Sequence, residues 1–130
     1  MENEKVVTEI VTVRIKTYED AVKETGRPEK PDFSNLPEDL REYFEAQYKA
    51  VVIAEALNEG WKADWSNSDQ EKWLPWFRGL SSGAFVFYVT YYGYSIASAG
   101  YGSRLCFKSD ELAEYAGKQF LDIYAAILQK

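Results

Sequence analysis

The sequence contains no histidine, and it contains a single cysteine among its 130 residues. Histidine is the commonest general base at neutral pH and the commonest zinc ligand, so its absence excludes Ser-His and Cys-His nucleophile pairs and histidine-based metal sites. The one cysteine, Cys106, forms neither an internal disulfide nor a thiolate metal cluster. We therefore expect no catalytic residues, no metal and no cofactor, and we predict that the protein is not an enzyme.

Long apolar runs are also missing. No run approaches the roughly 20 residues that a membrane-spanning helix needs. Residues 1–5 lack the basic and then apolar order of a secretory signal peptide. A lone cysteine suits a reducing compartment, and in its apolar run Cys106 is expected to be a small buried side chain rather than a reactive thiol. We predict a cytoplasmic protein with no membrane contact.

Basic residues are outnumbered, because 15 Lys and Arg stand against 21 Asp and Glu and give a formal net charge of −6. Nonspecific binding of duplex DNA depends on Lys and Arg that neutralise phosphates, so the total charge argues against it. The charge is segregated along the chain, since residues 38–45 are rich in acid. Stretches poor in acid carry the basic residues Arg14, Lys16, Arg104 and Lys108. A local basic patch is therefore compatible with the acidic total.

The composition is that of one folded domain. Hydrophobic residues make up 46% of the chain and charged residues 28%, and the length is sufficient to bury a core without disulfides or metal. No internal repeat or low-complexity tract divides the sequence. We expect a single domain over residues 1–130.

The first part of the chain carries signals for a strand and a helix. Residues 6–16 alternate between apolar and polar side chains, which is typical of a half-buried strand. Thr17 and Asp20 form a weak capping box. They predict a short helix from Tyr18 to Glu24, ending at Gly26.

A loop and a long helix follow. Residues 27–35 contain two prolines and are predicted to be a loop. Pro37 suits the first turn of a helix and Gly60 suits its end, so we predict a helix from Pro37 to Glu59. Its acidic residues are interpreted as a solvated face rather than as an acid site.

The middle of the chain holds the tryptophans. Residues 61–83 show no clean periodicity and include all four, which predicts an ordered Trp-rich loop with a short strand at residues 72–77. Residues 84–92 are rich in aromatic and β-branched side chains. We predict that they pair with residues 103–108 in an antiparallel hairpin with a long connection.

The last helix is predicted to begin after the N-cap Ser109 and to run almost to the C-terminus. Gly117 lies in its middle, where it weakens the helix and so indicates close packing against another part of the backbone. The predicted fold class is therefore α+β: a small antiparallel sheet packs against two long helices, and the Trp-rich loop lies at one end.

Aromatic residues are concentrated in this same middle region, since 12 of the 21 lie between residues 61 and 101. Aromatic side chains form cores and also binding faces. Alternation along residues 84–92 places Tyr88 and Tyr92 on one face, and the predicted pairing adds Arg104 and Lys108 beside them. Our candidate binding residues are Tyr88, Tyr92, Arg104, Lys108, Trp65, Trp73 and Trp76.

Two interpretations of these residues stay open. Tyrosine with Arg and Lys on an open sheet is typical of single-stranded nucleic-acid binders, which combine stacking with charge. The other interpretation is a face covered by the Trp-rich loop or by a second subunit, and the acidic total favours it. Acidic residues beside the tryptophans also resemble the composition of sugar-binding clefts. Separately, residues 64–69 lack the pattern of a calcium loop and are predicted to be a turn.

Four segments of the sequence carry a resemblance to a known family. They are residues 53–62 (IAEALNEGWK), 73–77 (WLPWF) and 102–120 (GSRLCFKSDELAEYAGKQF), with the opening at 15–21 (IKTYEDA). Over about residues 17–128 the chain resembles a family of short uncharacterised proteins encoded in phages, prophages and mobile elements of gut bacteria. The resemblance implies a phage-related origin and an intracellular location, and it implies no chemistry. Family members begin nearer Lys16, so residues 1–14 are expected to be an extension or edge strand that pairs with the sheet or with another subunit.

The predicted function is noncatalytic. We expect a phage-related accessory or interaction protein whose aromatic surface binds a protein partner or a second copy of the chain. The alternative is a single-stranded nucleic-acid or small-ligand binding module that uses Tyr88, Tyr92, Arg104 and Lys108, and a histidine-independent enzyme comes third. Salt-dependent binding of short oligonucleotides would favour the second, and converging carboxylates in a closed pocket would favour the third.

Overall fold

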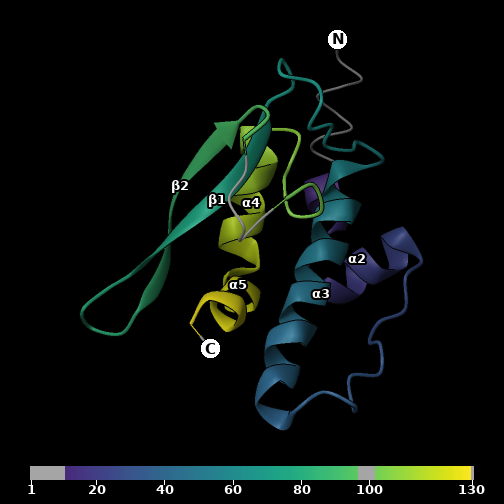
Figure 1. Cartoon of the computed structure of the whole chain (residues 1–130), viewed down its shortest axis with the longest axis vertical. Helices are drawn as coiled ribbons and strands as arrows, with labels where there is room; N and C mark the ends of the chain where they lie inside the picture. Colours follow the sequence, from purple (N-terminus) through teal and green to yellow (C-terminus); the bar gives the residue numbers. More distant parts are fainter. Residues whose placement is uncertain (1–10, 97–101, 130) are drawn as a thin grey trace.

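The computed structural model describes residues 11–96 and 102–129 of the chain (Figure 1). The elements are, in order, α2 (Tyr18–Thr25), α3 (Glu38–Asn58), β1 (Lys72–Gly79), β2 (Phe85–Gly93), α4 (Asp110–Gln119) and α5 (Leu121–Leu128). The β1–β2 hairpin packs on α4, α4 and α5 lie beside α3, and α2 packs on the far side of α3. The α+β class predicted from the sequence is confirmed.

Residues 11–14 are helical, so the predicted strand is wrong over these residues. The backbone N–H of Ile15 donates to the carbonyl of Val11 at 2.9 Å, which is the bond of an α-helical turn. Val11 and Ile15 are buried, whereas Val13 is 63% exposed. Alternation and a four-residue repeat both place Val11 and Ile15 together, and only the exposure of Val13 distinguishes the two patterns. The remainder of the predicted strand and extension, residues 1–10, lies outside the described residues.

The predictions for the next two helices are confirmed. In α2 the hydroxyl of Thr17 accepts from the N–H of Asp20, and the Asp20 carboxylate accepts from the N–H of Thr17. This reciprocal capping box starts the helix, and Gly26 follows its end. Residues 27–35 form no helix or strand, and the bounds of α3 differ from the predicted ones by a single residue at each end.

The hairpin has a different partner strand from the one predicted. Residues 84–92 pair with β1, so the prediction that they pair with residues 103–108 is wrong. The two strands are joined by a short turn in which the N–H of Leu80 donates to the carbonyl of Ala84 at 2.8 Å. Gly83 has a φ of 92° in this turn, a backbone conformation that residues other than glycine rarely adopt. A neighbouring strand joined by a short turn is favoured over a distant one because it costs less loop-closure entropy.

The Trp-rich loop is correspondingly shorter than the predicted range of residues 61–83. Trp73 and Trp76 lie in β1, and only Trp61 and Trp65 lie in the connection between α3 and β1. The tryptophans are therefore divided between a loop and a sheet.

Residues 103–108 contribute one bridge to the sheet instead of a strand. Within the described residues, Phe107 and Trp73 exchange N–H to carbonyl bonds of 2.8 and 2.9 Å on the edge of β1 that faces away from β2. Pro75 is the next residue whose backbone faces this edge, and it has no N–H to continue the ladder. The pairing therefore ends after one residue pair.

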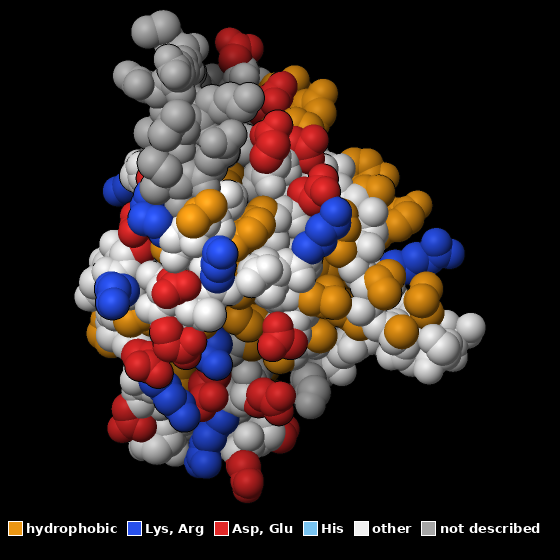
Figure 2. Space-filling view, turned by 180° about the vertical axis from the view of Figure 1, so that it is seen from behind, with side chains coloured by type: hydrophobic (Ala, Val, Ile, Leu, Met, Phe, Trp, Pro, Cys, Tyr) orange, Lys and Arg blue, Asp and Glu red, His pale blue; other side chains and the backbone are white. Residues whose placement is uncertain are grey.

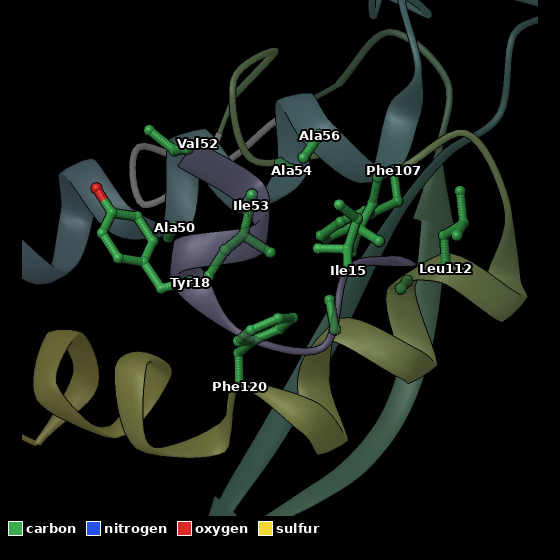
Figure 3. Packing of buried hydrophobic residues seen from close by; sticks show 14 of the residues in the cluster. Ile15, Tyr18, Ala50, Val52, Ile53, Ala54, Ala56, Phe107, Leu112 and Phe120 are labelled. Carbon is green, nitrogen blue, oxygen red and sulfur yellow. The ribbon is translucent and has the colours of Figure 1, made fainter. Parts of the chain in front are cut away.

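The predicted last helix is interrupted at Phe120, where the backbone has φ −114° and ψ 34°. Phe120 is nevertheless buried, and its ring points into the core (Figure 3). After the break, Tyr124 of α5 packs against Phe77 of β1 with ring centroids 4.9 Å apart. The two shorter helices therefore replace the second long helix expected from the sequence.

Gly117 marks a close approach, as predicted, but to side chains of the hairpin rather than to another backbone. A β-carbon at Gly117 would lie 2.6 Å from Cδ1 of Phe87 and 2.9 Å from Cβ of Pro75. These distances are below van der Waals contact, so only glycine lets α4 lie this close to the sheet.

The core lies between α3, α4 and the segments that precede α2 and α4. Figure 3 shows Ile15, Ile53, Phe107 and Phe120 pointing toward one another from four parts of the chain. Small buried side chains of α3 let these segments approach it closely; Ala46, Ala50 and Ala54 follow one another at four-residue spacing along one side.

Asn58, the last residue of α3, is a buried polar residue that links the helix to residues 106–108. Its side-chain Nδ2 donates to the carbonyl of Cys106 at 2.9 Å, and its Oδ1 accepts from the N–H of Lys108 at 3.0 Å. Bonds to the carbonyl of one residue and the N–H of the second residue after it are those that a neighbouring strand makes. The Asn58 amide therefore takes the place of a strand on the open side of this segment.

We expect Gly117→Ala to lower the free energy of unfolding. Overpacking costs about 1–3 kcal/mol, which exceeds the gain of roughly 1 kcal/mol in helix propensity. Denaturant unfolding measures the difference, and Gly79→Ala is the matched control because a β-carbon there meets nothing within 4 Å. A more stable Gly117→Ala protein would contradict the close approach.

We expect Asn58→Ala to destabilise the fold strongly, because it leaves the Cys106 carbonyl and the Lys108 N–H without partners. Each unsatisfied buried group costs about 1–3 kcal/mol. Asn35→Ala, at an exposed loop position, is the control and should change stability by less than about 0.5 kcal/mol. Equal thermal midpoints for the two variants would show that the amide bonds contribute nothing.

Candidate functional site

A β-bulge decides which hairpin side chains share a face. The register pairs Trp76 with Val89 but Phe77 with Phe87, so Tyr88 is an extra residue in β2. Directly opposite residues share a face, and successive residues alternate between faces. The extra residue reverses the alternation of β2 relative to β1.

Tyr88 and Tyr92, which the sequence places on one face, therefore lie on opposite faces. Tyr92 pairs with Trp73, with ring centroids 4.6 Å apart, and Trp73 shares its face with Pro75, which packs on α4. Tyr88 instead lies under the guanidinium of Arg78, 5.6 Å from the ring centroid. The prediction of a shared face is wrong because alternation does not continue through the bulge.

Eight side chains share the hairpin face opposite α4, and four of them are exposed and define what we call the open hairpin face: Trp76, Arg78, Tyr88 and Tyr91. The other four are buried or half-buried: Lys72, Leu74, Val86 and Val89. The Trp76 and Tyr91 rings meet edge to face at 5.2 Å. Trp76 is 44% exposed, Tyr88 53% and Tyr91 54%. Figure 2 shows hydrophobic side chains gathered over the hairpin side of the molecule. The four exposed side chains form two contacting pairs, Trp76 with Tyr91 and Tyr88 with Arg78. A second pair of exposed rings, Tyr92 and Tyr94, lies beside Trp73, with centroids 5.5 Å apart.

Lys108 and Arg104 lie elsewhere, and the prediction that they stand beside the hairpin tyrosines is wrong. The Phe107 bridge is on the edge of β1 away from β2, so β1 separates Lys108 from the strand that carries Tyr88. Arg104 lines a cavity beside the C-terminal end of α3. The positions of both residues differ from the predicted ones because residues 103–108 do not pair with β2.

This cavity has a volume of about 530 Å³. We call it the basic cavity, because three cationic side chains and one carboxylate line it together with a tryptophan: Arg27, Lys62, Arg104, Glu55 and Trp61. These residues come from the loop after α2, from α3, from the connection to β1 and from the segment before α4. The cavity therefore joins parts of the chain that are distant in sequence.

Arg27 and Glu55 form a two-bond ion pair at the cavity wall. Nε and one terminal nitrogen of Arg27 donate to the two carboxylate oxygens, each at 2.7 Å. Hydrogen bonding from Arg27 lowers the pKa of Glu55, and the charges of Arg104 and Lys62 lower it further. Glu55 therefore stays ionised and paired with Arg27, and it is not a candidate general base.

Trp65 and Lys72 have a structural role. Lys72 is completely buried, and its Nζ donates to the carbonyls of Asn67 and Gln70 at 3.2 and 3.1 Å. The same Nζ lies 5.0 Å from the centroid of the Trp65 ring. The lysine thereby fastens the connection before β1, and Trp65, a predicted binding residue, covers it.

The acidic run at residues 64–69 forms turns, as predicted. Asp64 accepts from the N–H and the hydroxyl of Ser66 at 3.0 and 2.6 Å. Across residues 11–96 and 102–129, no group of three or more His, Cys, Asp or Glu side chains is placed to hold a metal ion. Over the same residues, no helix is long and apolar enough to cross a membrane.

Comparisons with protein-family models, with curated proteins and with solved structures gave no match to this chain. The open hairpin face and the basic cavity are therefore the features from which a function is inferred.

The sequence predictions missed Tyr91, Arg78, Arg27 and Lys62 as surface groups of interest. Alternation places Tyr91 on the opposite face from Tyr88 and Tyr92. No residue type in β2 indicates the bulge that brings Tyr88 onto the same face as Tyr91. Arg27 and Lys62 converge only through the packing of separate elements. Of the four basic residues that the sequence analysis singles out in acid-poor stretches, only Arg104 lines the basic cavity.

We expect the folded protein to lose stability as the pH rises between 9 and 11. Burial raises the pKa of the Cys106 thiol from its ordinary value of 9.0 to about 11. The unfolded chain therefore loses this proton first, which favours unfolding over that interval. Denaturant midpoints measured across this range should fall less steeply for Cys106→Ala than for the unaltered protein. Parallel curves for the two proteins would contradict this assignment.

Proposed function

We propose that the protein is a noncatalytic interaction module whose hairpin binds another protein chain. The resemblance to short phage and prophage proteins gives the proposal its setting, that of a phage-related accessory protein in the cytoplasm. The observation that carries the proposal is the open hairpin face, where three exposed aromatic rings and one guanidinium adjoin a strand edge that no described residue pairs with.

The composition of this face is that of a protein-binding surface. Tyr, Trp and Arg are the residues most enriched in interface hot spots, because they combine a large apolar area with a polar group. Trp76, Tyr91 and Arg78 supply all three types on one side of a two-stranded sheet. A sheet face of this kind gains free energy when a partner removes it from water.

The edge of β2 adds a second means of binding. Trp73 directs its N–H and carbonyl to Phe107, away from β2, so its opposite residue Tyr92 directs its own groups away from β1. Thr90 does the same two residues earlier. No described residue bonds to these groups, and β2 contains no proline. An extended segment of a partner can therefore add to the sheet at this edge.

The charge on the open hairpin face favours a protein over a nucleic acid. Arg78 is its only cation among the described residues, since Arg104 and Lys108 lie away from it. Single-strand binders combine stacking with a groove of several cations, and the chain as a whole carries a charge of −6. A single-stranded nucleic-acid binder is therefore the second candidate, supported by the exposed aromatic rings alone.

We expect Trp76→Ala and Tyr91→Ala to weaken association of the chain with its protein partner. Sedimentation equilibrium over a range of concentrations tests a second copy as that partner, and each substitution should raise the dissociation constant about 10-fold or more, as for interface hot spots. Hydrogen exchange should show the Thr90 and Tyr92 amides protected in the associated form.

Phe44→Ala is the matched control, because Phe44 is an exposed aromatic residue of α3, away from the hairpin. It should leave association unchanged. The proposal would be refuted by a monomer at all concentrations that instead binds short oligonucleotides in a salt-sensitive manner, with binding abolished by Arg78→Glu. That result would promote the second candidate.

A further inference from the structure

The basic cavity concentrates positive charge on an acidic protein. Arg27, Lys62 and Arg104 line it against a single carboxylate, Glu55, although acidic residues outnumber basic ones in the chain. Like charges brought together at one concave surface repel one another, so such an arrangement lowers stability unless an anion binds there.

Two of the three cationic side chains make no hydrogen bond or ion pair with a described residue. Arg27 is already bound to both oxygens of Glu55, the only carboxylate among the described residues that line the cavity. Lys62 and Arg104 form no side-chain hydrogen bond or ion pair with any described residue, although both are close enough to lower the pKa of Glu55. The cavity therefore offers an ammonium group and a guanidinium group to a ligand.

The shape and the aromatic wall of the cavity restrict the ligand further. Its volume of about 530 Å³ is that of a small-molecule site. Guanidinium and ammonium groups together are typical of phosphate recognition, and the indole of Trp61 in the wall supplies a surface for a planar ring. We propose that the basic cavity binds a nucleoside diphosphate or a phosphorylated ligand of the same kind, with phosphates on Lys62 and Arg104 and the base against Trp61.

This site is separate from the open hairpin face. None of the cavity residues belongs to β1 or β2, and none of the hairpin aromatic residues lines the cavity. Failure of either proposal therefore leaves the other standing.

Isothermal titration of the full chain with adenosine diphosphate and, separately, with inorganic pyrophosphate tests the site. We expect adenosine diphosphate to bind and to change the tryptophan fluorescence. Arg104→Ala and Lys62→Ala should each weaken binding about 10- to 100-fold, the effect of removing a hydrogen bond from a charged group. Both side chains are exposed, so the variants should keep the unaltered melting temperature.

Lys23→Ala is the matched control, because it removes the same charge from an exposed position on α2. It should bind as the unaltered protein does. If Lys23→Ala weakens binding as much as Arg104→Ala and Lys62→Ala do, the effect comes from the overall charge of the protein, and the proposed site is wrong. Absence of binding in the unaltered protein would overturn it as well.

The base is tested through Trp61. We expect adenosine diphosphate to bind more tightly than pyrophosphate, and we expect Trp61→Ala to remove that difference while pyrophosphate binding persists. A base that stacks on an aromatic side chain contributes about 5- to 150-fold in affinity. Equal affinities for the two ligands in the unaltered protein would overturn the assignment to a nucleotide.

Discussion

The fold depends on residues 106–108, which are hydrogen-bonded on both sides. On one side Phe107 exchanges two backbone bonds with Trp73 of β1, and on the other side the amide of Asn58 bonds to Cys106 and Lys108. This short segment therefore connects the end of α3 to the start of the hairpin. It also sets where α4 begins, because Ser109, the cap of α4, follows directly. The hairpin, α3 and α4 are placed relative to one another by three consecutive residues.

Signals contained within a few residues predicted the fold best. The capping pair Thr17 and Asp20 and the start of α3 after Pro37 depend on neighbours along the chain, and both were predicted within a residue or two. Features that depend on distant parts of the chain were not predicted. The exposure of Val13 depends on which other parts of the chain pack nearby, and after the break at Phe120 a tyrosine of α5 packs against the hairpin. A sequence pattern describes one element, whereas these outcomes are set by the packing of several.

The errors in the candidate site come from the same cause. One wrong strand pairing placed Arg104 and Lys108 beside the tyrosines, and one bulge at Tyr88 reversed the assignment of faces. The concentration of aromatic residues could be seen in the sequence, but whether the hairpin tyrosines are exposed stayed open, and Tyr88, Tyr91 and Tyr92 are exposed in the structure. Their neighbours were not predicted, since neighbours across a sheet depend on register, and register is fixed by turns and bulges. The sequence therefore indicates which kinds of side chain the hairpin carries, but it does not indicate which of them are neighbours in the folded protein.

Pro75 makes the two edges of the sheet unequal. The edge of β1 is occupied by Phe107 and then interrupted by a residue without an N–H, whereas β2 has an edge that can accept a further strand. Two copies joined through their β2 edges would expose only the interrupted β1 edges at the outside. Such growth would be self-limiting: the proposed assembly would be a symmetric pair related by a twofold axis, with no template left for a third chain. In that assembly a single proline would separate a finite dimer from an open-ended fibre.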